Sequence, residues 1–109
     1  MSQTPGQFRS IAIETYRAQF QPDDHLLLDV REDWEWAMGH LPGAVHIPMN
    51  TIPDRHNELP SDKPVVVVCA HGMRSLQVSQ YLAHIGFSDI YNLEGGTAEW
   101  VAKGLPVER

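Results

Sequence analysis

The sequence predicts an α/β fold built on a parallel sheet. Residues 26–30 and 64–68 form two nearly continuous apolar runs, and the second is rich in β-branched valine. Such runs are typical of strands that are covered on both faces inside a parallel sheet. A helical pattern follows the second run, because apolar residues recur there at i, i+3, i+4 and i+7. These residues are Val78, Tyr81, Leu82 and Ile85. Strands that alternate with helical segments indicate βαβ units, and therefore parallel strands.

The beginning of the chain is expected to contribute little to the core. Residues 1–9 contain turn formers and few apolar side chains, so they are interpreted as a loose lead-in to a single domain over residues 10–109. Ile11 and Ile13 predict a short edge strand, which leads into a helix over residues 14–20. This helix is expected to end before Pro22, because proline disfavours helical geometry in the preceding residue.

The strand at residues 26–30 is expected to be interior, and three shorter elements follow it. They are a helix over residues 33–38, a strand over residues 44–47 and a polar helix over residues 50–57. Gly39 ends the first helix. Pro42 and Gly43 predict a turn before the strand, and Pro48 ends that strand.

The last third of the chain begins with a strand, a tight loop and a helix over residues 63–86. Gly86 suits the left-handed cap that ends a helix. A strand over residues 90–93 and a helix over residues 97–103 are expected next. The glycine pair at residues 95–96 is interpreted as a backbone pivot between them. Gly104 and Pro106 then close the domain.

Composition excludes several classes of function. The chain has 109 residues, of which 42% are hydrophobic and 20% are charged, as in an ordinary globular domain. A net charge of −6, with no basic run, argues against a nucleic-acid or anionic membrane partner. No apolar run approaches the ~20 residues that span a bilayer, and no signal-peptide pattern is present. One cysteine permits no internal disulfide. A cytoplasmic location is therefore expected.

The single cysteine, Cys69, follows the valine-rich strand directly. In an open α/β sheet ligands bind at the carboxyl edge of the strands. The amides of the next loop and the N-terminus of its helix favour an anion at that edge, and Arg74 is near in sequence. The pKa of a thiol in this setting falls below the free value of ~8.5. The pattern thus predicts an activated cysteine, and the alternative is a small buried hydrophobic residue.

Other residues of the same loop suit this interpretation. Gly72 permits close backbone approach or a positive φ, and Arg74 supplies a fixed planar charge. Their alternatives are an ordinary turn and a solvated side chain. His71 could act as a base, but a solvated polar residue is the favoured interpretation.

The remaining polar and aromatic residues suggest no second site. The other histidines lack ligand spacing, so no metal site is expected, and no organic cofactor motif is present. They are His25, His40, His46, His56 and His84. The acidic residues Glu32, Asp33 and Glu35 predict the solvated face of a short helix. The tryptophans are interpreted as core or rim packing.

Four segments, in order, resemble motifs of the single-domain rhodanese family, which is thiosulfate sulfurtransferase-like. The segments are DVRE at residues 29–32 with Glu35, GHLPGA at residues 39–44 with Ile47 and Pro48, CAHGMRS at residues 69–75, and LEGG at residues 93–96 with Trp100. The family patterns are D-V-R-E…E, G-H-I-P-G-A-x-N-I-P, C-x-x-G-x-R-S and L-x-G-G-x-x-x-W. His46 departs from them, because the family often has asparagine there. The resemblance covers about residues 10–106.

The resemblance implies a rhodanese-like α/β fold, with a central parallel five-stranded sheet flanked by helices on both faces. It implies that Cys69 is the catalytic nucleophile and carries a persulfide. The substrate-binding loop would then comprise Ala70, His71, Gly72, Met73, Arg74 and Ser75. Asp29 and Arg31 would be supporting residues near this loop.

The expected reaction is sulfur transfer from thiosulfate, or a similar anionic sulfane donor, to cyanide or a thiol, including a protein thiol. No metal or organic cofactor is expected. One alternative is a relay or partner-binding module with little turnover of its own. Another is a phosphatase or arsenate reductase, but related phosphatases have a C-x5-R loop, whereas Cys69 and Arg74 form C-x4-R. The shorter loop suits a sulfur atom better than a phosphate.

Overall fold

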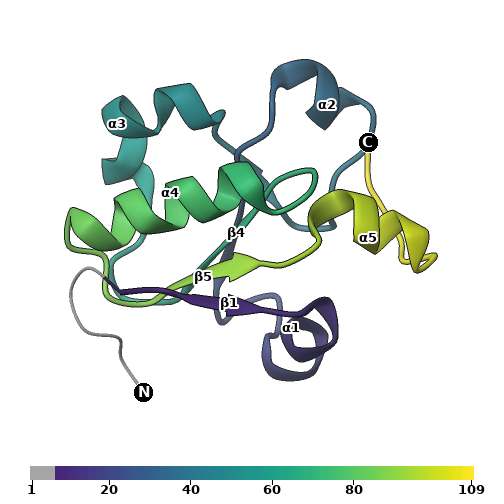
Figure 1. The fold of residues 1–109 in the computed structure, drawn as a ribbon, viewed down its shortest axis with the longest axis horizontal. Coiled ribbons are helices and arrows are strands. Elements are labelled where there is room, and N and C mark those ends of the chain that lie inside the picture. The colour runs from purple at the N-terminus through teal and green to yellow at the C-terminus, as the bar shows by residue number, and fades with distance from the viewer. Residues whose placement is uncertain (1–6) are drawn as a thin grey trace.

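The centre of the molecule is a five-stranded parallel sheet, and a computed structural model describes it within residues 7–109 (Figure 1). The strand order is β1-β5-β4-β2-β3. The strands are β1 (Arg9–Ile11), β2 (Leu26–Asp29), β3 (Val45–His46), β4 (Val65–Val68) and β5 (Ile90–Leu93). The α/β fold with a parallel five-stranded sheet is thus confirmed, and β2 is an interior strand as expected.

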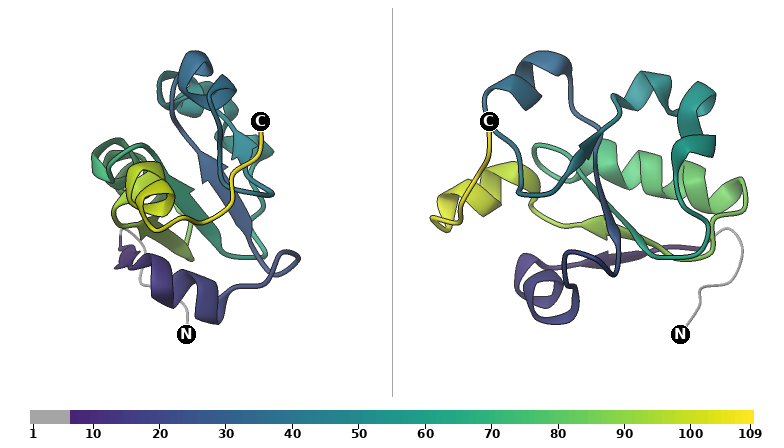
Figure 2. Two further views of the ribbon diagram at one scale, coloured as in Figure 1. Left: turned by 90° about the vertical axis from the view of Figure 1, so that its right-hand side faces the viewer. Right: turned by 180° about the vertical axis from the view of Figure 1, so that it is seen from behind.

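Helices cover both faces of this sheet. They are α1 (Ile13–Gln19), α2 (Asp33–Ala37), α3 (Ile52–Arg55), α4 (Met73–His84) and α5 (Gly96–Ala102). Side chains of α3 and α4 pack on one face, and those of α1 and α5 pack on the other. Figure 2 shows α1 and α4 on opposite sides of the strands. Within residues 7–109 no helix combines the length and apolarity needed to cross a membrane.

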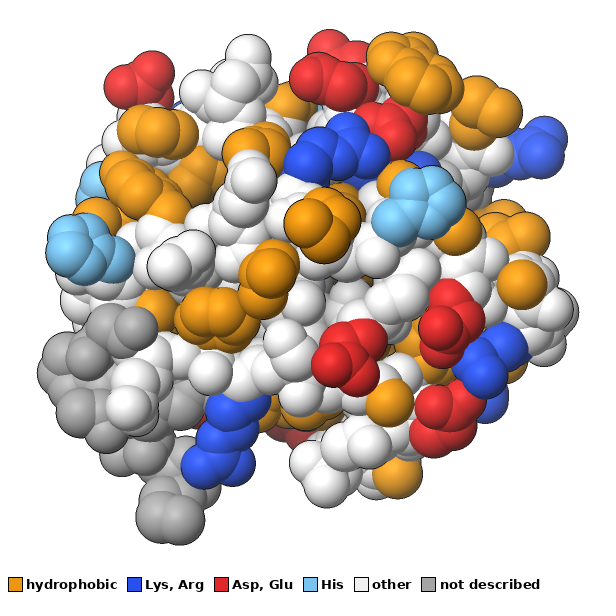
Figure 3. Space-filling model, in the orientation of Figure 1, with side chains coloured by type: hydrophobic (Ala, Val, Ile, Leu, Met, Phe, Trp, Pro, Cys, Tyr) orange, Lys and Arg blue, Asp and Glu red, His pale blue; other side chains and the backbone are white. Residues whose placement is uncertain are grey.

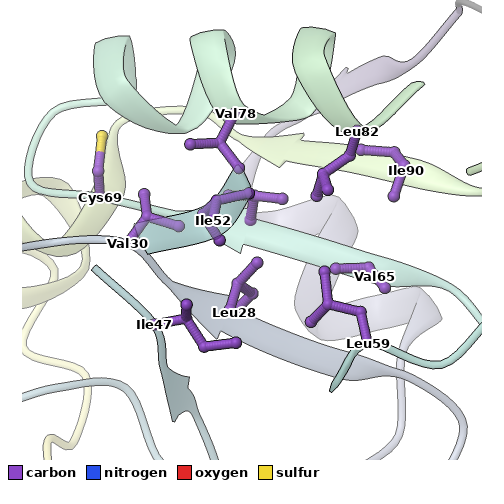
Figure 4. Packing of buried hydrophobic residues seen from close by; sticks show 11 residues of the cluster. Leu28, Val30, Ile47, Ile52, Leu59, Val65, Cys69, Val78, Leu82 and Ile90 are labelled. Atoms are coloured by element: carbon purple, nitrogen blue, oxygen red, sulfur yellow. The ribbon is translucent and has the colours of Figure 1, made fainter. Parts of the chain in front are cut away.

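β4 is buried on both faces because it lies between β5 and β2 under both helical layers. All four of its valines are at most 1% exposed. Val65 and Val67 face the α4 layer, together with Cys69, and Val66 and Val68 face the α5 layer. Figure 4 shows Cys69 at one end of the α4-side cluster, with its sulfur directed away from the packed side chains. The continuous valine run is therefore explained by burial on two sides.

The beginning of the domain differs from the prediction in one respect. Ile13 is not in the edge strand: β1 ends at Ile11, and Ile13 is the first residue of α1. Ala12 is extended, with φ −75° and ψ 159°, and the chain turns into the helix after it. Ile13 is buried in the α1–α5 layer. Its apolar side chain therefore anchors the first turn of α1 in the core and does not mark a strand. Arg9, assigned to the lead-in, begins β1, and residues 1–6 of that lead-in lie outside the described residues.

Two helical predictions also need correction. The polar helix over residues 50–57 is three short pieces, in which α3 lies between the 3₁₀ turns Met49–Thr51 and His56–Glu58. It is not polar throughout, because Ile52 is 1% exposed. α4 ends at His84, so Ile85 lies beyond the buried stripe and is exposed.

The end of α4 has the cap that its glycine predicts. Gly86 has φ 116°, in the left-handed region. The amide of Phe87 donates to the Leu82 carbonyl at 3.0 Å, and the amide of Gly86 donates to the Ala83 carbonyl at 3.3 Å. This pair of bonds is a Schellman motif, which satisfies carbonyls at the helix end.

The register of β2 and β4 places the candidate residues at one edge. Asp29 pairs with Val68, so Arg31 and Cys69 both leave the sheet at its carboxyl edge. The amide of Val30 also donates to the Val68 carbonyl at 3.1 Å. The prediction that the two segments share this edge is confirmed.

Candidate active site

The sulfur of Cys69 lies inside a turn of backbone amides. The amide of Gly72 donates to Sγ at 3.1 Å, and the amide of Ser75 donates to it at 3.2 Å. Gly72 has φ 100° and is the N-cap of α4, and this conformation is accessible mainly to glycine. It bends the loop so that the first amides of α4 converge on the sulfur. The predicted convergence of loop amides on the cysteine is therefore present, and Cys69 is only 1% exposed.

Two opposing effects act on the thiol. Burial raises the pKa of Cys69, because it disfavours the charged thiolate. Hydrogen bonds from the Ser75 side chain and from the amides of Ser75, Gly72 and His71 lower the pKa by more. The net pKa is below the ordinary value, as predicted from the sequence. Amides and a hydroxyl account for this shift, whereas the prediction had also invoked Arg74.

The N-terminus of α5 fixes the outer side of the same loop. The amide of Thr97 donates to the Cys69 carbonyl at 2.8 Å, and the amide of Ala98 donates to the Ala70 carbonyl at 2.9 Å. A Cβ atom at Gly96 would collide with both carbonyl oxygens. The carbonyls are thus bound on the outside, while the amides of the loop point inward. The predicted glycine pivot therefore allows α5 to approach the backbone of the active loop closely.

A buried polar chain lies behind the sulfur. The Sγ of Cys69 is 3.4 Å from the Ser75 hydroxyl oxygen, and this hydroxyl makes a short hydrogen bond with Asn92 Oδ1. Asn92 Nδ2 donates to Ser10 Oγ at 3.3 Å. Ser75 and Asn92 are 0% and 4% exposed, so each is held by its neighbours. Sequence reasoning missed Asn92, although it is a polar residue inside an otherwise apolar strand.

Arg74 and Glu35 form a bidentate ion pair at the mouth of the loop. Nη1 donates to Oε1 at 2.7 Å, and Nη2 donates to Oε2 at 2.8 Å. The hydrogen bond from Arg74 lowers the pKa of Glu35 to about 2, although burial opposes it. Glu35 also accepts the amide of Glu32 at 2.9 Å and completes the capping box of α2. The predicted solvated face is therefore wrong for Glu35, whose side chain is 11% exposed. The alternative of a free, solvated Arg74 is also wrong.

Asp29 and Arg31 form a second, buried pair beside the loop. Arg31 Nε donates to both carboxylate oxygens of Asp29, at 3.0 and 3.1 Å, and its backbone amide donates to Oδ1 at 2.9 Å. Arg31 Nη2 donates to the Gly39 carbonyl at 2.7 Å. These bonds hold the segment that connects β2 to α2.

Aromatic stacking holds α2 from its other side. Trp36 lies between two imidazoles, with ring centroids 3.5 Å from His40 and 4.8 Å from His46. His46 Nε2 hydrogen-bonds the Arg31 carbonyl at 2.7 Å. His46, where the sequence departs from the family pattern, therefore contacts the segment that connects β2 to α2. Trp36 has the rim-packing role that the sequence predicts.

The remaining loop side chains are directed outward. His71 is exposed and Met73 is 67% exposed, while Ala70 is half-buried. They surround the mouth of the loop, whereas Ser75 lies behind the sulfur. Among residues 7–109 no group of three or more His, Cys, Asp or Glu side chains is placed to hold a metal ion.

Comparisons with known proteins agree with this geometry. Residues 12–103 match the model of the rhodanese-like domain. A protein of Allochromatium vinosum named sulfurtransferase is 42% identical over 85 residues, which cover 78% of this chain and 79% of that protein. The crystal structure of a rhodanese-related protein from Thermoplasma volcanium has a TM-score of 0.84 and 32% identity, and the match covers 92% of this chain and 97% of that one. An NAD-dependent persulfide reductase from A. fulgidus matches with a TM-score of 0.68 and 39% identity over 85% of this chain, but only 16% of that longer protein.

Proposed function

This chain belongs to the rhodanese-like domain family, and we propose that it is a sulfurtransferase that carries sulfur as a persulfide on Cys69. The observation that carries the proposal is the convergence of the Gly72 and Ser75 amides on Sγ. Such a ring stabilises an anion before any substrate arrives. A thiolate and a persulfide are both anions on sulfur, so one cradle serves both states.

In the first half of the reaction, the Cys69 thiolate attacks the outer sulfur of thiosulfate or a similar sulfane donor. A new S–S bond forms to Cys69, the S–S bond of thiosulfate breaks, and sulfite leaves with the bonding electron pair. Arg74 retains N–H groups beyond the two that bind Glu35. We propose that these groups orient the anionic donor.

In the second half, cyanide or a thiolate attacks the outer sulfur of the persulfide. The S–S bond to Cys69 breaks and its electron pair returns to Cys69 as the thiolate, which the amide ring again stabilises. The two half-reactions predict ping-pong kinetics through a covalent intermediate. The similarity to part of a persulfide reductase supports a persulfide carrier.

Mass spectrometry tests this proposal directly. After incubation with thiosulfate, the intact protein should gain the mass of one sulfur atom, and cyanide should remove it. Cys69→Ser should abolish both the added mass and the formation of thiocyanate. Sulfur transfer that persists in Cys69→Ser would contradict the mechanism.

The alternatives of the sequence analysis are separated by two further measurements. Aryl phosphate hydrolysis should not exceed that of the Cys69→Ser control, and hydrolysis lost in that variant without any persulfide would favour a phosphatase. A protein that forms the persulfide but passes it only to a protein thiol would be a relay.

A further inference from the structure

An open groove runs beside the active loop between α2 and α5, and nothing in the proposed half-reactions with thiosulfate and cyanide requires it. Its volume is about 330 Å³. Trp34 on α2, Met38 just after α2 and Val101 on α5 form its walls. Ala70, the residue after Cys69, contributes to the loop side. We call it the α2–α5 groove. It lies along the outer side of the active loop, because Ala70 lines it and α5 is hydrogen-bonded to the Cys69 and Ala70 carbonyls.

The walls of the groove are apolar although they face solvent. Trp34 is 67% exposed, Met38 is 68% exposed and Val101 is 54% exposed. The space-filling view shows hydrophobic side chains next to acidic ones on the surface over α2 (Figure 3). Large exposed hydrophobic side chains that gather at the mouth of a reactive site are unfavourable in water, and a ligand that covers them gains affinity.

The charges around the groove disfavour an anionic ligand. Arg31 is the arginine that lines it, and Asp29 binds Arg31 in a buried ion pair. Glu32 and Asp33 are exposed and precede Trp34 on the chain. The exposed carboxylates of Glu32 and Asp33 would therefore repel an anionic ligand, and Arg31 would not be free to bind it. An uncharged apolar group fits better.

The size of the groove indicates a small molecule. A volume of about 330 Å³ is at the lower end for small-molecule sites, which span roughly 300–1,000 Å³. Thiosulfate has no apolar part, so the donor does not use the groove. The acceptor remains.

We propose that the α2–α5 groove binds the acceptor, and that this acceptor is an uncharged thiol with an apolar chain. The inference rests on the proposed persulfide mechanism. The thiolate of the acceptor attacks the outer sulfur of the Cys69 persulfide, the S–S bond to Cys69 breaks, and the products are the acceptor persulfide and the Cys69 thiolate. The chain of the acceptor meanwhile covers Trp34 and Val101.

N-Acetylcysteamine and N-hexanoylcysteamine test this inference, because their chains differ while the thiol keeps the same pKa. The protein is first converted to its persulfide with thiosulfate, and its discharge by each thiol is followed by mass spectrometry. The hexanoyl compound should reach half-maximal rate at a roughly tenfold lower concentration, since part of four added methylenes leaves water. Trp34→Ala and Val101→Ala should reduce this difference to about twofold or less.

Ile85→Ala is the matched control, because Ile85 is also exposed but lies at the far end of α4. It should keep the tenfold difference, and Ile85→Ala should respond to N-acetylcysteamine as the unaltered protein does. Equal half-maximal concentrations for the two thiols would overturn the inference and leave the mechanism intact, as would a difference that Trp34→Ala and Val101→Ala do not change. A groove that serves a protein partner would give that equal result. Failure to form any persulfide would overturn both the mechanism and the inference.

Discussion

Arg74 and Glu35 lie 39 residues apart in the chain, yet their side chains form two parallel hydrogen bonds of 2.7 and 2.8 Å. The pair joins the first turn of α4 to α2, and therefore links the active loop to one wall of the groove beside it. Because Glu35 neutralises much of the charge of Arg74, the proposed role of the guanidinium is to orient the donor more than to attract it. We therefore make separate predictions for replacement of Arg74 and of Glu35.

Replacement of Arg74 by alanine should lower kcat/KM for thiosulfate by roughly ten- to a hundredfold. Loss of a charged hydrogen bond costs about 1.5–3 kcal/mol, and Glu35 would face the Cys69 thiolate without its partner. Steady-state kinetics with thiosulfate and cyanide measure the effect. Arg74→Lys should recover only part of it, because lysine cannot bind a carboxylate in bidentate fashion. Unchanged kinetics in Arg74→Ala would show that the side chain has no role in donor binding.

The pair should also make stability depend on pH in acid. The folded-state pKa of Glu35 is about 2, below its ordinary value of 4.5. A lowered pKa contributes stability that is present above about 4.5 and is lost as the pH falls through about 2. Urea unfolding should therefore show Glu35→Gln less stable than the unaltered protein at pH 6, with the difference shrinking toward pH 2. A difference that stays constant over this range would contradict the assigned pKa.

The Cys69 thiolate should titrate below ~8.5, the free value, and Ser75→Ala should raise the midpoint. Burial raises the pKa of Cys69, whereas the Ser75 side chain lowers it. The Ser75 hydroxyl donates to Asn92 Oδ1 beside the neutral thiol, and we expect it to turn and donate to the sulfur when the thiolate forms. Thiolate absorbance against pH gives the midpoint without requiring a reagent to reach the buried sulfur.

Ser79→Ala is the matched control for this titration. Ser79 is as buried as Ser75 and lies one turn further along α4, but its hydroxyl has no hydrogen-bond partner among the described residues. The control should leave the midpoint unchanged. Equal shifts in both variants would mean that general repacking of α4, and not the hydroxyl of Ser75, sets the pKa.

Gly96→Ala should destabilise the protein and reduce sulfur transfer together. Its φ of 60° disfavours a side chain, and a Cβ atom would collide with the carbonyl oxygens of Cys69 and Ala70. Gly104→Ala separates these two causes, because Gly104 has φ 74° with no neighbouring atom within 4 Å of a Cβ. The control should lose about 1–2 kcal/mol of unfolding free energy, and Gly96→Ala should lose about 1–3 kcal/mol more. Equal losses on urea unfolding would show that the α5 contact does not constrain the loop.

The sequence by itself determined the elements that depend on local pattern. The valine run predicted β4, the i, i+3, i+4 spacing predicted α4, and the position of Cys69 between them predicted an amide cradle at the sheet edge. These predictions succeed because a strand buried on both faces and an amphipathic helix each leave a short-range signature. The prediction that Ile13 belongs to a strand was wrong for a related reason. An apolar residue at this spacing fits a strand and the start of a helix equally well.

Only the tertiary structure decided which distant groups complete the site. Glu35, Asn92 and Thr97 reach the cysteine loop from 39, 17 and 28 residues away. Each arrives through the order of the strands, which places β5 and β2 on either side of β4. Periodicity reports whether a residue is buried, but it does not report which element lies beside it. For this reason a solvated Glu35 and a paired Glu35 have the same local sequence, and only packing distinguishes them.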